Sequence, residues 1–93
     1  MNPHERLARA DRARVMMEDD LFVEVMDTMR EKLNEEFRNC PLRDKEGLYE
    51  IHRMIRTLDG FVKNFKLIVD DGKQAKLDIE HESLMSKAKR AFR

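Results

Sequence analysis

The chain has 93 residues, of which 41% are hydrophobic and 41% are charged, and its 19 basic and 19 acidic side chains cancel. This hydrophobic fraction excludes wholesale disorder, and three glycines, two prolines and no tryptophan leave little turn chemistry for an all-β fold. A composition rich in Glu, Lys, Arg, Leu and Met favours helices, so we expect a single all-α domain over residues 1–93.

The first predicted helix begins at Pro3, where Asn2 supplies the cap, and continues to about Met17. Residues 1–14 hold four basic and two acidic side chains, so segment 1–18 is a basic N-terminal helix. Its apolar content is thin. A helix this polar needs a partner or stays mobile.

The second predicted helix covers about 20–39, with Asp19 or Asp20 as its cap and an apolar face. That face consists of Phe22, Val25, Met26, Met29, Leu33 and Phe37. Residues 15–37 carry a net charge of −6 from eight acidic and two basic side chains. The helix should end near Asn39, because Pro41 disfavours the helical conformation at Cys40. The short link that follows is typical of antiparallel helices.

The third predicted helix covers about 44–71, begins at the capping residue Asp44 and ends before Gly72, a natural left-handed terminator. An apolar heptad with 3-4-3-4-3-4 spacing follows it: Leu48, Ile51, Ile55, Leu58, Val62, Phe65 and Val69. Met54, Phe61 and Ile68 widen this stripe. We therefore predict a long antiparallel helical hairpin over 19–72.

At 1.5 Å per residue, the third helix outruns the second by roughly 10 Å, so its far apolar end needs another cover. The first helix, the C-terminal segment and a second copy of the chain are all candidates. We predict a protein interface, and a homo-oligomer, at this end: Leu58, Phe61, Val62, Phe65, Ile68 and Val69.

Segment 73–93 is predicted to end in a basic amphipathic helix that carries Leu84, Met85, Ala88 and Phe92. Together with the basic N-terminus it provides possible contacts to nucleic-acid phosphates: Arg6, Arg9, Arg12, Arg14, Lys87, Lys89, Arg90 and Arg93. The alternative is that a basic terminal helix docks on the acidic block 15–37, since alternating charge blocks favour ordered contacts between helices and between chains.

The sequence contains no motif for metal binding, phosphate binding or nucleophilic catalysis. The three histidines are far apart, Cys40 is the single cysteine, and no Gly-rich phosphate loop or nucleophile elbow is present. We expect no catalytic residue, metal, cofactor or small-molecule substrate, and hence no enzyme. No apolar run is long enough to span a membrane, no signal-peptide core follows the polar start, and a lone cysteine fits a compartment where thiols are reduced.

The methionines of the second and third helices have two interpretations. Met26, Met29 and Met54 lie on the apolar faces, where plain core filling explains them, but Met-rich faces also mark adaptable binding grooves.

The stretch from Asp20-Leu21-Phe22 through Pro41-Leu42-Arg43-Asp44-Lys45-Glu46-Gly47 to Asp71-Gly72-Lys73 resembles small helical-hairpin proteins of tailed-bacteriophage and prophage genomes. These proteins are often encoded among head and DNA-packaging genes. The resemblance covers about residues 15–76 and lends neither a catalytic residue nor a cofactor. It implies a virion-associated or assembly protein, in the host cytoplasm or the virion, that contacts a phage structural protein.

Two hypotheses follow. The first is a structural or assembly protein that acts through helix-mediated contacts, either by oligomerising or by docking on a virion component. The second is a small nucleic-acid-binding or DNA-packaging accessory protein that uses its basic termini.

Overall fold

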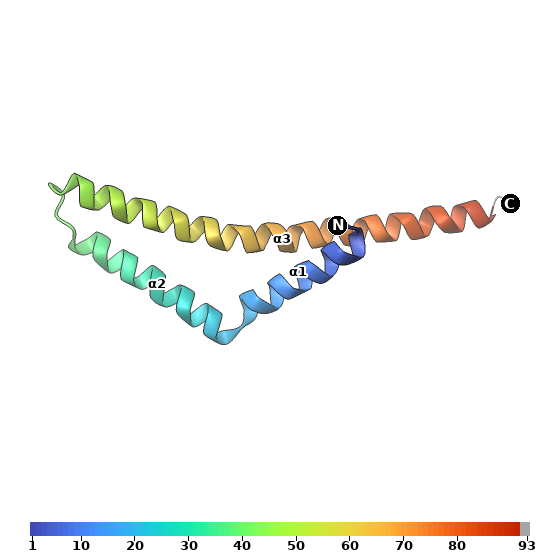
Figure 1. The fold of residues 1–93 in the computed structure, drawn as a ribbon, viewed down its shortest axis with the longest axis horizontal. Helices are drawn as coiled ribbons and strands as arrows, with labels where there is room; N and C mark the ends of the chain where they lie inside the picture. The colour runs from blue at the N-terminus through green and yellow to red at the C-terminus, as the bar shows by residue number, and fades with distance from the viewer. Residues whose placement is uncertain (92–93) are drawn as a thin grey trace. The chain divides into compact units, whose positions relative to one another are not determined.

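A computed structural model describes residues 1–91 of the chain and builds them from three helices (Figure 1). These are α1 (Pro3–Glu18), α2 (Asp20–Asn39) and α3 (Lys45–Ala91). The described residues form no strand, so the predicted all-α class is confirmed.

Each helix begins at a polar side chain that accepts a hydrogen bond from the first turn. Asn2 Oδ1 accepts from the backbone N–H of Glu5 at 2.8 Å, and Asp19 Oδ1 accepts from that of Phe22 at 3.0 Å. Asp44 Oδ1 accepts from the N–H of Gly47, also at 3.0 Å. These bonds satisfy donors that an isolated helix start leaves unpaired. The predicted starts of all three helices are confirmed.

The third helix ends later than we predicted. We predicted that it stops at Asp71 before a Gly72 terminator and that a separate C-terminal helix follows, but α3 continues without a break to Ala91. A glycine terminator needs a positive φ, and no glycine among the described residues has one. Gly72 is instead a buried helical residue where α1 approaches.

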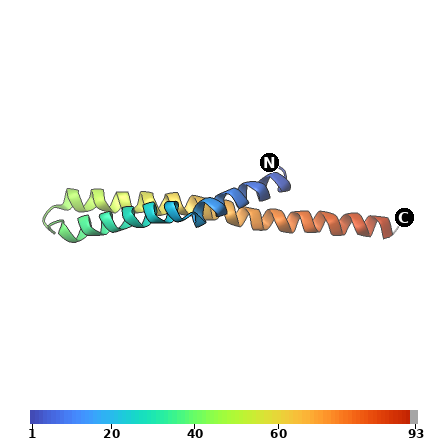
Figure 2. The ribbon, with the colours of Figure 1, turned by 90° about the horizontal axis from the view of Figure 1, so that it is seen from below.

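The described chain contains two compact units, and α3 contributes to both. In the unit Met16–Asn64, α2 packs against the first part of α3, in the opposite direction (Figure 2). Met26, Leu33 and Leu58 are buried together, and the partly buried residues Phe22, Ile55 and Val62 surround them. Ile55, Leu58 and Val62 of the predicted heptad stripe therefore face α2.

The second unit combines Met1–Val15 with the part of α3 from Phe65 onward. Small residues make its helix contact: Ala10, Ala13 and Ala75 are buried, as is Gly72. A Cβ atom placed on Gly72 would lie 3.6 Å from the Cα of Ala10 and would overlap the Ala10 methyl group. Because both residues are small, the two backbones approach closely.

Candidate protein-docking groove

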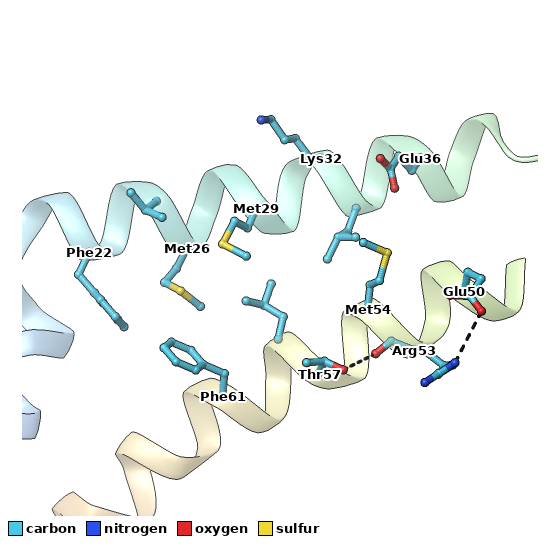
Figure 3. Close-up of a pocket in the computed structure, with 13 residues that line it drawn as sticks. Phe22, Met26, Met29, Lys32, Glu36, Glu50, Arg53, Met54, Thr57 and Phe61 are labelled. Carbon is cyan, nitrogen blue, oxygen red and sulfur yellow. Dashed lines mark hydrogen bonds and ion pairs between the residues drawn. The ribbon is translucent and has the colours of Figure 1, made fainter. Parts of the chain in front are cut away.

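An apolar groove of about 750 Å³ lies between α2 and the first part of α3 (Figure 3). We call it the α2–α3 groove. Its lining residues come from both helices: Phe22, Val25, Met26, Met29, Lys32, Leu33, Glu36, Glu50, Arg53, Met54, Thr57, Leu58 and Phe61. Spacings of three and four residues place these side chains on one side of each helix.

The floor of the groove is the small core of this unit. Met26, Leu33 and Leu58 are buried there, and the Phe22 and Phe61 rings stack against each other with centroids 6.5 Å apart. Offset stacking of this kind stabilises a ring pair beyond its area burial. Phe22 and Phe61 therefore close one end of the groove with an apolar surface.

The walls are apolar but far from covered. The exposed fractions are 47% for Val25, 45% for Met29, 51% for Met54 and 48% for Phe61. Single exposed apolar residues are ordinary on a protein surface, whereas a contiguous apolar patch marks a contact site. This groove gathers four such residues on one surface.

The end of the groove near the connection between the helices is charged. Glu36 extends from α2 there, and Glu50 and Arg53 extend from α3, where their side chains pair at 3.6 Å (Figure 3). The α2–α3 groove thus has an apolar end and a charged end that holds both signs.

The six residues of the predicted interface take different positions in the structure. Leu58 is buried in the core, Val62 packs against that core, and Phe61 is half exposed in the groove. Phe65, Ile68 and Val69 are only partly exposed, in the unit that also contains α1. The surface that stays most open therefore lies nearer the start of α3 than we predicted.

The residues predicted to contact phosphates also differ in their surroundings. Arg6 pairs with Asp71 at 2.7 Å and with Asp78 at 3.1 Å, so its guanidinium is already occupied. Lys87, Lys89 and Arg90 are exposed on the last turns of α3, which continue past the start of α1 in both views (Figures 1 and 2). Arg9, Arg12 and Arg14 are exposed on α1, and Arg93 lies outside the described residues.

The ion pair of Arg6 shifts the titration of both partners. Hydrogen bonds from Arg6 lower the pKa of Asp71, and hydrogen bonds to Asp71 and Asp78 raise the pKa of Arg6. Both groups therefore stay charged over the whole neutral range. They join α1 to α3.

Cys40 lies in the connection between α2 and α3, where its thiol donates a long contact of 3.9 Å to Asp44 Oδ2. Burial, followed by the negative charge of Asp44, raises the pKa of the Cys40 thiol. A raised thiol pKa makes this cysteine a poor nucleophile.

Residues 1–91 hold neither a cluster of metal ligands nor a membrane-spanning helix. No group of three or more His, Cys, Asp or Glu side chains lies together there in a way that would hold a metal ion. No helix in this range is both long and apolar enough to cross a membrane. Comparison with protein-family models, curated proteins and solved structures finds no match to this chain.

The groove residues that the predicted interface left out are Phe22, Val25, Met29 and Met54. Their apolar spacing is visible in the sequence, and the methionines there suggest an adaptable groove. What the sequence does not show is how much of each apolar face the neighbouring helix leaves open.

Proposed function

We propose that this protein acts through protein–protein contact and that the α2–α3 groove receives the apolar face of a partner's helices. The observation that carries this proposal is the half exposure of Val25, Met29, Met54 and Phe61 on one continuous surface. Removing such a surface from water drives association, because apolar burial stabilises by about 25 cal/mol per Å².

The thin core of the unit supports the same proposal. Among the described residues, no large side chain is fully buried, and the core cluster holds three buried residues. Helices are stable when their apolar stripes are covered by another layer of structure, and a pair of helices covers only part of each stripe. A partner on the groove would complete this layer.

The side chains in the groove suit a helical partner. Met29 and Met54 are unbranched and adapt to the shape of a facing surface, and the charged end provides groups that fix the orientation of docking. A helical partner presents ridges that pack between these side chains.

The phage-like layout from Asp20 to Lys73 supplies the biological setting that we propose, the assembly of a virus particle. In that setting the chain is a non-enzymatic structural or assembly protein of the host cytoplasm or the virion. Its partner is either a second copy or a phage structural protein. The nucleic-acid alternative loses one of its eight predicted contacts, because Arg6 already pairs with Asp71 and Asp78.

Methionine footprinting tests the proposal. Native complexes that contain the chain are treated with hydrogen peroxide, and the oxidation of each methionine is measured by mass spectrometry. We expect protection of Met29 and Met54 relative to the same protein diluted to a free state. Met85, which is 49% exposed near the end of α3, is the internal control. Equal oxidation of Met29 and Met54 in the complex and in the free protein would overturn the proposal.

A further inference from the structure

The two ends of the α2–α3 groove differ, and this difference restricts what can dock there. Figure 3 shows the helices separating from the Glu36 and Glu50 end toward the Phe22 and Phe61 end. Two contacts set the alignment of the helices, the Phe22–Phe61 stack and the 3.0 Å ion pair between Arg30 and Asp59. With this alignment, Val25 lies level with Phe61, and Glu36 lies level with Arg53 (Figure 3).

The groove carries both signs, with Arg53 and Lys32 against Glu36 and Glu50, and three of these four, Glu36, Glu50 and Arg53, lie at its charged end (Figure 3). A partner with a charge of a single sign would meet like charges here, and a purely apolar partner would strip water from charges without pairing them. A surface that matches this one presents the same groups in exchanged positions. A second copy of the chain does so.

Resting on the proposed function, we infer that the occupant of the α2–α3 groove is a second copy of the chain, docked with its two-fold axis along the groove. The connections between α2 and α3 then lie at the same end of the dimer. In this arrangement each α2 packs beside the partner's α3 and diagonally from the partner's α2, as in a four-helix bundle.

A two-fold axis along the groove places complementary side chains opposite each other at both ends of the groove. At the apolar end, Val25 faces the partner's Phe61. At the charged end, Glu36 faces the partner's Arg53, and the symmetry makes this contact twice. An axis perpendicular to the groove would lay apolar walls over charged side chains and would leave those charges buried and unpaired.

The size of the face is enough for a specific dimer. A pair of 20-residue helices presents roughly 30 Å by 20 Å, so about 1,200 Å² in total would be buried, at the low end of stable interfaces. We therefore expect a dimer whose population depends on concentration in the micromolar range or above.

Sedimentation equilibrium of the purified full chain, from about 1 µM to about 1 mM, tests the occupant. The mass is expected to rise from 11.1 kDa to twice that value. Arg53→Glu places a carboxylate opposite the partner's Glu36, and Glu36→Arg places two guanidinium groups opposite each other. Each variant alone should weaken the dimer about tenfold or more, and an equimolar mixture should restore it as a heterodimer. Circular dichroism confirms that each variant keeps its helices.

The direction of the axis is tested by a spin label at Leu42→Cys, a fully accessible loop position, in a Cys40→Ser background. Label-to-label distances near 20 Å support an axis along the groove, and distances near 40 Å overturn it. A monomer at every concentration, or failure of the mixed variants to pair, overturns the inference. If the chain is a monomer but Met29 and Met54 are protected in native complexes, a different protein fills the groove and the proposed function stands.

Discussion

Ala10 of α1 packs directly against the bare backbone of Gly72 in α3, and a methyl group on Gly72 would overlap the Ala10 methyl group. The contact belongs to the unit formed by Met1–Val15 and the part of α3 from Phe65 onward. It explains why a glycine lies in the middle of a 47-residue helix, where glycine costs about 1 kcal/mol relative to alanine. The close approach of α1 offsets that cost.

Substitution of the helical glycines in α3 should therefore have opposite effects at two positions. Gly72→Ala should destabilise the protein by about 1–3 kcal/mol, because α1 must move away from α3. Gly60→Ala should stabilise it by about 0.5–1 kcal/mol, because a Cβ atom there meets nothing within 4 Å. Urea denaturation of both variants at one protein concentration measures the difference. A gain in stability from Gly72→Ala would mean that α1 does not pack at Ala10.

The ion pair between Arg6 and Asp71 makes stability depend on pH in the acid range. Arg6 lowers the pKa of Asp71, so the folded protein keeps this carboxylate charged at pH values where the unfolded chain takes up a proton. The resulting stability is present above the unfolded carboxyl pKa of about 4 and is lost as pH falls through the lower folded pKa.

Asp71→Asn should thus lower the melting temperature at pH 7 and flatten its decline below about pH 4. The neighbouring variant Asp70→Asn is the control, because Asp70 pairs with Lys73 of the same helix, at 3.6 Å across one exposed turn. Thermal melts of the three proteins between pH 2 and pH 7 make the comparison. Identical pH profiles for Asp71→Asn and the unmodified chain would contradict a linkage through Arg6.

The start of α2 depends on the Asp19 side chain, which accepts the N–H of Phe22. Asp19→Ala should cost about 1 kcal/mol of unfolding free energy, within the 0.5–2 kcal/mol range of lost helix caps. Asp27→Ala, at an exposed position inside the same helix, should change stability by less than about 0.5 kcal/mol. Equal effects of the two substitutions in urea titrations would show that Asp19 does not cap α2.

The helix starts could be predicted from the sequence because their signals are local. Asn2, Asp19 and Asp44 each accept from an N–H group three residues later, so the whole motif lies within one turn. The end of α3 could not be predicted in the same way. Gly72 suits either a terminator or a close helix contact, and the choice depends on Ala10, which lies 62 positions earlier in the chain.

The site could be predicted only in part for the same physical reason. Periodicity identifies which side of a helix is apolar, but not what fraction of that side the next helix covers. Val25 and Met29 belong to the predicted apolar face of α2, yet they stay half exposed in the groove. Arg6 was predicted as a phosphate contact, and its pairing with Asp71 and Asp78 depends on residues more than 60 positions away.

The connection between α2 and α3 gives a last prediction, on the reactivity of Cys40. Burial and the nearby Asp44 carboxylate both disfavour the thiolate, so alkylation of the folded protein at pH 8 should be slower than that of the urea-unfolded chain. Asp44→Asn removes the negative charge but keeps a side chain that caps α3, so it should raise the alkylation rate without loss of the helix. The variant should still react more slowly than the unfolded chain, since burial is the larger cause of the raised pKa.

Iodoacetamide kinetics followed by mass spectrometry between pH 7 and pH 10 measure the alkylation rates of the folded protein, the unfolded chain and the Asp44→Asn variant. Equal rates for the folded and unfolded chains would show that Cys40 is not shielded, and equal rates for the unmodified protein and Asp44→Asn would remove Asp44 as a cause.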